Sequence, residues 1–256
     1  MINNFDSKKT FYQINIKKDP PIIFIHGVGL NHSIWEPQID AFDNTVITYD
    51  ILGHGKTPLV KEDITFDDFS DQLTNLVDEL KVKKFHLVGF SIGSLIARNF
   101  ACRFNDRLES LTLLCSVFKR SKDQQQIVND RFELAKKNKS LSKQALKRWF
   151  TDDYLNKNPK IYDKITSILD KNNIKNFLKV YQLFVQHGDK EEFNKIKIKT
   201  LVITGEGDVG STPDMSKNLS AKIESSSLII VNGGKHLCSI ECPDDVNNAI
   251  KRLINA

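Results

Sequence analysis

The residues best suited to chemistry lie in the pentapeptide GFSIG, which spans residues 89–93. The apolar run FHLVGF leads into Ser91, and the run IGSLIARNF, which favours a helix, follows it. This serine is therefore predicted to lie on a sharp strand-to-helix turn, with its hydroxyl above the sheet edge and the positive end of the helix beside it. Because a serine hydroxyl is a weak nucleophile near neutral pH, it needs a neighbouring base. The segment predicts nucleophilic catalysis by Ser91, assisted by a base from elsewhere in the chain.

A histidine is the usual base for a serine nucleophile. The sequence contains six histidines: His26, His32, His54, His86, His187 and His236. The first and third belong to glycine-containing turns, the fourth to a predicted strand and the fifth to a long helical region. His32 could line a pocket, although a solvated loop position fits it better. His236 follows the last predicted strand, at the sheet edge that carries Ser91, and is therefore the predicted base.

The base needs a carboxylate that fixes its tautomer and stabilises its protonated form. Asp208 follows another predicted strand in the segment GEGD, and it completes the chain order nucleophile, acid, histidine. Glu206 is near but is expected to point elsewhere, and Asp214 is expected to cap the start of a helix. The strand that ends at Cys115 offers no carboxylate. We therefore predict that Asp208 is the acid of a Ser–Asp–His triad.

The negative charge that develops on a substrate oxygen needs hydrogen-bond donors. The backbone N–H of Ile92, next to the nucleophile, is one candidate, and the N–H of Val28 in the loop HGVG is the other. A second glycine-containing loop, DILGHG, includes Asp50 and His54, to which we assign architectural roles. A metal site built from these two residues and His26 lacks a recognisable ligand spacing. We therefore expect neither a metal nor a cofactor.

Apolar runs and helical periodicity predict the strands and helices around these residues. Six short apolar runs are predicted strands: Pro21–Ile25, Thr45–Tyr49, Phe85–Phe90, Leu111–Cys115, Thr200–Thr204 and Leu228–Val231. Three stretches are predicted helices: Phe66–Leu80, Ile92–Phe104 and Pro243–Ile254. Continuous apolar strands that alternate with helices indicate an α/β fold, with a mostly parallel sheet covered by helices on both faces.

One long region breaks this alternation. From residue 119 to residue 193 the segments are helical and polar, rich in lysine and asparagine, with scattered aromatic residues and no good strand. We expect a helical insertion at 119–193 between two parts of a core, 1–118 and 194–256. Such an insertion serves naturally as a lid over an active site. A helical layer without a gating role is the alternative.

The composition of the 256-residue chain limits the classes of partner. Hydrophobic residues make up 40% and charged residues 27%, an ordinary balance for a globular protein. The net charge of +5 is spread over scattered lysines without a basic stripe, so we expect no nucleic-acid partner. The chain has neither an apolar run of about 18 residues for a membrane span nor an apolar signal region at its start. The four cysteines form no C-x-x-C pair, so a zinc or thioredoxin-like site is not favoured. We expect a soluble cytoplasmic protein with reduced thiols and leave its oligomeric state open.

Several segments together resemble α/β-hydrolases of the 3-oxoadipate enol-lactonase type. They are HGVGLNHSIWEPQ, YDILGHGKT, HLVGFSIGSLIARNFA, LLCSVFKRS, TGEGDVGSTPDM and GGKHLCSIECPDDVN, and KRWFTDDYLNKNP in the insertion is similar to the lid of those enzymes. The resemblance runs from about Pro21 to the C-terminus. It implies an α/β-hydrolase fold with a helical lid, and a serine hydrolase that cleaves a small enol-lactone or carboxylic ester through an acyl-enzyme.

The resemblance also bears on the substrate pocket. An enol-lactone of this kind carries a carboxylate, so a basic group is expected, with Arg120, Arg148 and the lid lysines as candidates. Trp149 in the lid motif is the predicted aromatic wall, and packing inside the lid is its alternative role. Ser94 and Lys235 depart from residues frequent in the family, which affects the expected substrate and leaves the triad intact. Two other functions stay open: hydrolysis of a carbon–carbon bond with the same triad, and a small-molecule receptor with slow turnover.

Overall fold

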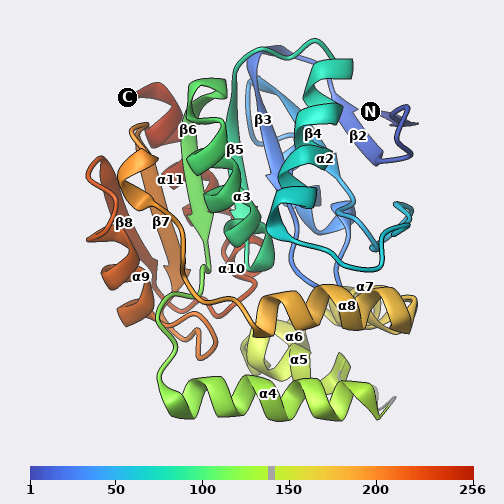
Figure 1. Ribbon diagram of the computed structural model, residues 1–256. Coiled ribbons are helices and arrows are strands. Elements are labelled where there is room, and N and C mark those ends of the chain that lie inside the picture. Colours follow the sequence, from blue (N-terminus) through green and yellow to red (C-terminus); the bar gives the residue numbers. More distant parts are fainter. Residues whose placement is uncertain (138–141) are drawn as a thin grey trace.

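The computed structural model describes residues 1–137 and 142–256. Its centre is an eight-stranded sheet with the order β1-β2-β4-β3-β5-β6-β7-β8 (Figure 1). The strands are β1 (Ile2–Phe5), β2 (Phe11–Asn15), β3 (Lys18–Ile25), β4 (Asn44–Tyr49), β5 (Phe85–Phe90), β6 (Leu108–Leu114), β7 (Thr200–Gly205) and β8 (Ser226–Val231). β1 and β2, and β2 and β4, pair antiparallel, whereas all pairs from β4 across to β8 are parallel. The predicted α/β fold with a mostly parallel sheet is confirmed.

All six predicted strands occur, with small differences at their ends. β5 and β7 are buried along their whole length, as expected for strands covered by helices on both faces. β1 and β2 are absent from the prediction. They extend the sheet by antiparallel pairing, and β1 is exposed at every position. Neither therefore has the continuous apolar run that marks an inner parallel strand.

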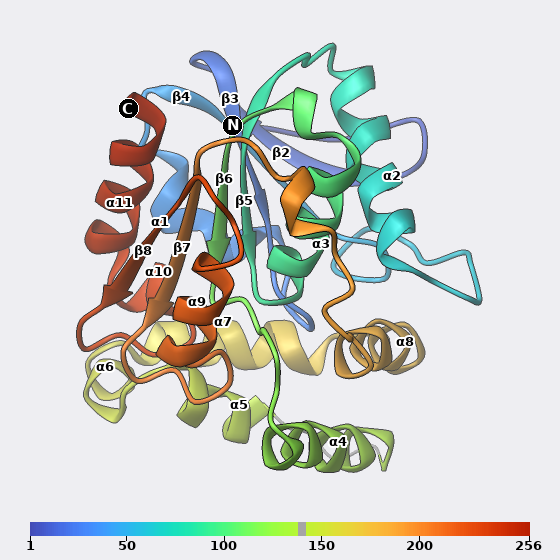
Figure 2. The same cartoon turned by 60° about the vertical axis from the view of Figure 1, so that its left-hand side comes forward.

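Helices cover both faces of the sheet, with α2 and α3 on one side and α1 and α11 on the other (Figure 2). These core helices and turns are η1 (His32–Trp35), α1 (Glu36–Ile39), α2 (Phe66–Glu79), α3 (Ile92–Arg103), η2 (Asn105–Arg107), α9 (Pro213–Ser220), α10 (Cys238–Glu241) and α11 (Pro243–Asn255). Neighbouring residues of β3, Ile23 and Phe24, belong to two different apolar cores. Because successive side chains of a strand point to opposite faces, one core lies under α2 and α3 and the other under α1 and α11. The three predicted helices are confirmed.

A group of helices separates β6 from β7. They are α4 (Lys122–Lys136), α5 (Ser142–Trp149), α6 (Asp152–Lys157), α7 (Pro159–Asp170) and α8 (Ile174–Val185), followed by the turn η3 (Phe193–Lys195). We call α4–α8 the cap helices. Figure 1 shows them together beyond one end of the sheet, which is the end where the chain leaves β6. They therefore cover the edge at which the parallel strands finish. In the described ranges, no helix is long and apolar enough to cross a membrane.

Candidate active site

Ser91 lies in the turn between β5 and α3. Its φ of +55° is a left-handed conformation that residues with side chains rarely adopt. Its N–H donates to the carbonyl oxygen of Leu114 on β6, at 3.0 Å. Gly93 permits this sharp turn because a Cβ at that position would collide with the carbonyl oxygens of Ile25 and His26. The segment GFSIG thus forms a strained strand-to-helix turn at the sheet edge.

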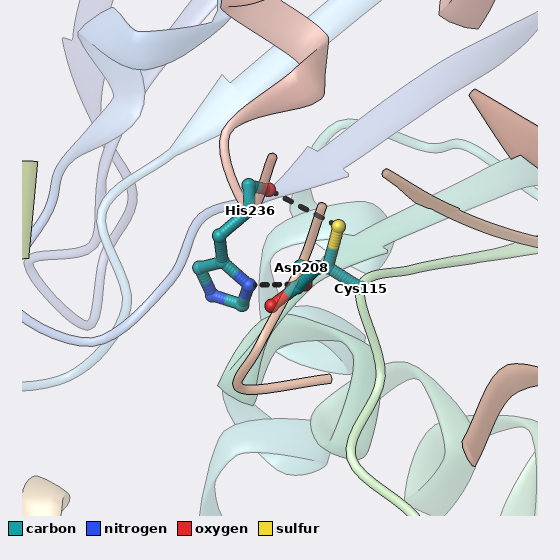
Figure 3. Close-up of side chains that lie close together, drawn as sticks. All are labelled: Cys115, Asp208 and His236. Atoms are coloured by element: carbon teal, nitrogen blue, oxygen red, sulfur yellow. Dashed lines mark hydrogen bonds and ion pairs between the residues drawn. The ribbon is translucent and has the colours of Figure 1, made fainter. Parts of the chain in front are cut away.

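Asp208 and His236 meet at the same edge (Figure 3). Nδ1 of His236 lies 2.6 Å from Oδ2 of Asp208. The other carboxylate oxygen, Oδ1, accepts hydrogen bonds from the N–H groups of Gly210 and Ser211 at 2.8 and 2.9 Å. Because a carboxylate only accepts, the proton of the neutral imidazole belongs on Nδ1 and Nε2 is left as the basic nitrogen.

The charges of this pair support each other. Burial raises the pKa of the Asp208 carboxyl, but His236 and the two backbone donors lower it more, so the net pKa lies below the ordinary value. Burial lowers the pKa of His236, but the Asp208 carboxylate more than compensates and raises it above the ordinary value. The pair therefore stabilises the imidazolium that forms when His236 accepts a proton.

The two other carboxylates considered for the acid lie elsewhere. Glu206 is exposed and accepts a hydrogen bond from the N–H of Gly233 at 3.2 Å. Asp214 is exposed in the first turn of α9, where it pairs with Lys217. Of the three candidates, only Asp208 contacts His236.

A cavity of about 660 Å³ opens over this edge, and Val28, Ser91, Asp208 and His236 all line it. No hydrogen bond joins Ser91 to His236 among the described residues. In sites without substrate this bond is often long and tightens only in the complex. Within the same ranges the N–H of Val28 has no acceptor. Ile92 begins α3, so no preceding helical carbonyl is available to its N–H.

This arrangement belongs to a known fold family. The family described as alpha/beta hydrolase fold matches residues 20–243. The chain is a member of the α/β-hydrolase fold family. The resemblance drawn from the sequence is confirmed at this level, and so is the predicted fold with its flanking helices.

Relatives of this α/β-hydrolase include two enzymes from Acinetobacter baylyi. It is 26% identical to (E)-2-((N-methylformamido)methylene)succinate hydrolase over 250 residues, and this alignment covers 96% of this chain and 94% of the relative. It is 27% identical to 3-oxoadipate enol-lactonase 1 over 249 residues, and this alignment covers 95% of this chain and 92% of the relative. Among solved structures, the enol-lactonase from Burkholderia xenovorans LB400 has a TM-score of 0.89, with 23% identity and full coverage of both chains. These matches support the prediction of a hydrolase of the carboxylic-ester kind.

Several histidines of this α/β-hydrolase connect its loops. Nε2 of His54 accepts from the N–H of Gly29 at 2.8 Å, and Nε2 of His26 accepts from a backbone N–H after β4 at 3.1 Å. Burial lowers the pKa of His26 to about 4 and that of His54 to about 3, so both are neutral acceptors near pH 7. The expectation of a solvated His32 is wrong. Its side chain is only 15% exposed, because Nδ1 lies 2.8 Å from the buried Asp50 carboxylate.

Cys115 is a residue of the site to which the sequence assigns no role. Its Sγ donates to the carbonyl oxygen of His236 at 3.1 Å (Figure 3) and lies 3.8 Å from Sγ of Cys238. Burial, reinforced by the second thiol, raises the pKa of Cys115 well above its ordinary value, so the thiol is protonated and can donate. Cys115, Asp208 and His236 place ligand atoms within 4.8 Å of one another. Because hydrogen bonds already engage these groups, we assign no metal to them.

The cap helices supply the other walls of the cavity. Trp149, the predicted aromatic wall, lines it with its ring centre 6.1 Å from that of His236. Arg120 and Arg148, the predicted basic candidates, line it as well. No lysine within 1–137 and 142–256 does, so the expected choice between arginines and lysines falls to the arginines in these ranges.

Arg131 and Tyr181 also line the cavity and are missed by the sequence reasoning. A signal for Arg131 exists in α4. Val128 and Ala135 are buried and line the cavity at positions three residues before and four residues after it. Residues at this spacing share one face of a helix. An arginine on the apolar face of a polar helix is therefore the feature that could have identified it.

Proposed function

We propose that this α/β-hydrolase is a serine hydrolase that cleaves a small carboxylic ester or enol-lactone through an acyl-enzyme. The observation that carries the proposal is the 2.6 Å contact between His236 and Asp208 in the wall of a cavity that Ser91 also lines. A histidine held in this way has a free Nε2, and the strained turn brings the serine to the same space. Nucleophile, base and acid thus come from three strand ends of one sheet.

In the proposed reaction the hydroxyl oxygen of Ser91 attacks the carbonyl carbon while Nε2 of His236 accepts the hydroxyl proton. The N–H groups of Val28 and Ile92 stabilise the negative charge on the carbonyl oxygen. The tetrahedral intermediate then expels the leaving oxygen, which takes the proton from His236. A water molecule, deprotonated by the same histidine, attacks the acyl-enzyme and releases the acid together with Ser91.

The size of the cavity and the names of the relatives support a small substrate. Its volume of about 660 Å³ lies within the usual range for small-molecule sites, ~300–1,000 Å³. One relative that matches more than nine-tenths of the chain is named as an enol-lactonase, and another as a hydrolase of a substituted succinate. An enol leaving group would tautomerise to a ketone, which draws the ring-opening forward. We therefore place enol-lactones beside simple esters as the first substrates to test.

We further propose that the cap helices act as a lid over the triad. They are bonded directly to the loop that carries the catalytic histidine. The N–H of Leu237 donates to the carbonyl oxygen of Trp149 at 3.0 Å. Glu241 accepts hydrogen bonds from the N–H and the hydroxyl of Thr151 at 2.8 and 2.6 Å. A movement of the cap helices would therefore act on the histidine loop, and closure would exclude water from the acyl-enzyme.

The test is a panel of enol-lactones, saturated lactones, short-chain methyl esters and p-nitrophenyl esters. We expect steady turnover of one of these groups, and a burst of p-nitrophenol that equals the enzyme concentration. Ser91→Ala should lose both. Ser227→Ala changes an exposed serine of β8 and should keep both.

Three results would contradict the proposal. Retained turnover in Ser91→Ala would place the nucleophile elsewhere. Cleavage of a carbon–carbon bond in a vinylogous diketone, without any ester or lactone turnover, would assign a different hydrolase reaction. Tight binding of a small molecule without a burst would indicate a receptor.

A further inference from the structure

Three arginines, Arg120, Arg131 and Arg148, line the cavity, and they differ in how their guanidinium groups are used. Arg120 donates to the carbonyl oxygens of Phe184 and Val185, both at 3.2 Å. Its guanidinium also lies 4.6 Å from the ring centre of Phe184. Arg120 therefore serves to bind the segment after β6 to the end of α8.

Arg131 on α4 and Arg148 on α5 have far fewer partners. Arg148 donates one hydrogen bond, from Nη1 to the carbonyl oxygen of Gln144 at 3.0 Å. Arg131 makes no hydrogen bond or ion pair within the described residues. Both side chains are half-buried. Most of the donors of two neighbouring guanidinium groups are thus unused in the wall of a cavity.

The two arginines also bring like charges to one cavity wall. Burial lowers the pKa of Arg148 to about 10, and the positive charge of Arg131 acts in the same direction. Both arginines line the same cavity. The carboxylates in the cavity wall are Asp208, which is bonded to His236, and Asp170, which is exposed at the end of α7. Neither arginine forms an ion pair with a carboxylate in the described parts of the chain. Two like charges in a partly desolvated place favour the binding of an anion between them.

Tyr181 adds a neutral donor at the same place. Burial raises the pKa of its hydroxyl, whereas Arg131, Arg148 and Arg120 all act to lower it. Tyr181 and the three arginines line the same cavity. Its hydroxyl has no hydrogen-bond partner among the described residues, although the residue is only 8% exposed. The hydroxyl is not among the fully buried atoms that lack a partner, so it can be reached from the cavity. A group bound in the cavity can therefore pair with it. An oxygen atom of an anion would be such a partner.

We propose that Arg131, Arg148 and Tyr181 form a subsite for a carboxylate of the substrate, remote from the carbonyl that Ser91 attacks. The inference rests on the proposed hydrolase function and names its substrate class: esters or enol-lactones that keep one free carboxylate, such as half-esters of dicarboxylic acids. Planar guanidinium groups bind carboxylates through paired hydrogen bonds, so the subsite fixes orientation as well as charge. The triad belongs to the sheet and the subsite to the cap, so the substrate length must match the distance between them.

The experiment compares monomethyl with dimethyl esters of the linear dicarboxylic acids from succinate to suberate, with methanol release as the measurement. We expect the wild-type enzyme to prefer monomethyl esters, with one optimal chain length. Arg131→Gln and Arg148→Gln should each lower kcat/KM for the best monomethyl ester by about tenfold or more, mainly through KM. The same variants should change kcat/KM for its dimethyl ester by less than about twofold, since that molecule has no carboxylate to lose.

Two controls separate charge from folding. Arg252→Gln replaces an exposed arginine of α11 and should leave both esters unaffected. Arg148→Lys should recover part of the lost preference, because a lysine keeps the charge without the paired geometry. An equal loss of monomethyl and dimethyl activity in Arg131→Gln and Arg148→Gln would overturn the subsite and assign these arginines to packing. A wild-type preference for dimethyl esters would overturn it as well, while leaving the hydrolase function in place.

A binding measurement keeps the subsite testable if none of these esters is hydrolysed. Titration of Ser91→Ala with glutarate, adipate or pimelate in a calorimeter should show binding that weakens with added salt and is lost after Arg148→Gln in the same background. Binding of these dianions without ester turnover would support the subsite while the hydrolase proposal fails. Absence of binding, or binding unchanged by Arg148→Gln, would overturn the subsite.

Discussion

Two regions with polar groups face one cavity. The triad edge is the end of the sheet with Ser91, Asp208 and His236, and the cap wall is the part of the cap helices with Arg131, Arg148 and Tyr181. They differ in how many of their polar groups have hydrogen-bond partners in the fold. At the edge, Asp208 accepts hydrogen bonds from His236 and from two backbone N–H groups, and the carbonyl of His236 has its own donor. In the cap wall, Arg131 has no partner among the described residues and Arg148 has a single one, Gln144. Asp208 and His236 are therefore held in place before a substrate arrives. In the proposed subsite, Arg131 and Arg148 gain hydrogen-bond partners when a carboxylate binds. We therefore expect the cap wall to determine which substrates bind.

The largest expected effect comes from the nucleophile at the edge. Ser91→Ala should lower kcat for the preferred ester by about 10⁶, because the acyl-enzyme cannot form. Its melting temperature should stay close to that of the wild type or rise, since Ala removes a polar side chain from a buried position. Dicarboxylate binding in the cap should persist, because the subsite does not use Ser91. Loss of binding together with turnover would show that the two regions are not independent.

The second largest effect is expected for Asp208, the predicted acid of the triad. Its replacement should lower kcat and also shift the pH dependence of kcat/KM. Asp208→Asn should lower kcat by about 10⁴, since the amide no longer fixes the tautomer of His236. In the wild type, kcat/KM should rise with pH as His236 loses its proton, at a pKa above the ordinary value. Without the carboxylate, burial lowers the pKa of the imidazole and only the smaller effect of Cys115 opposes it. The rising limb of the pH profile should therefore move to lower pH in Asp208→Asn. A small loss of kcat with an unmoved limb would point to another acid.

The triad edge could be predicted from the sequence, whereas Arg131 and Tyr181 in the cap wall could not, for a physical reason. Ser91, Asp208 and His236 each follow an apolar run that marks a buried strand, and parallel strands deliver their carboxyl ends to one edge. Arg131 depends on which face of α4 packs over the cavity, and this is set by contacts with α8, far away in the sequence. The pairing of His32 with Asp50, 18 residues later, is likewise invisible to local reasoning. The same limit applies to β1, which is exposed at every position, and to β2, in which only Phe11 and Tyr12 are buried, because neither carries a continuous apolar run.

The contrast extends to stability, where a paired and an unpaired arginine should behave differently. Arg98 is fully buried and donates to Asp189 and Glu191 at 2.8 and 2.7 Å. Arg98→Met should therefore lower the free energy of unfolding by about 3 kcal/mol, because two half-buried carboxylates lose their cation. Arg148→Met should change it by less than about 1 kcal/mol, since no carboxylate depends on that residue in the described chain. Urea denaturation measures both.

The matched control is Arg103→Met, which removes ion pairs with the exposed carboxylates of Asp67 and Asp71 and should cost less than about 1 kcal/mol. If Arg148→Met destabilised the protein as much as Arg98→Met does, the cap arginine would have a structural partner. Its assignment to substrate binding would then fail. If Arg98→Met proved neutral, the ion pairs where the chain returns from the cap to the core would add nothing to stability.

The smallest effect concerns the support of the histidine loop by Cys115. Cys115→Ala removes the donor to the buried carbonyl of His236 and should lower kcat a few-fold, with about 1 kcal/mol of stability lost. Cys115→Ser keeps a donor in nearly the same volume and should recover most of kcat. Cys102→Ala, whose thiol contacts Glu192, is the matched control and should leave kcat unchanged. Equal losses in the serine and alanine variants would mean that the volume of the sulfur, and not its hydrogen bond, holds the loop. In that case packing, and not a hydrogen bond, would hold the triad edge at this point, and the edge would differ less from the cap wall in how far hydrogen bonds satisfy it.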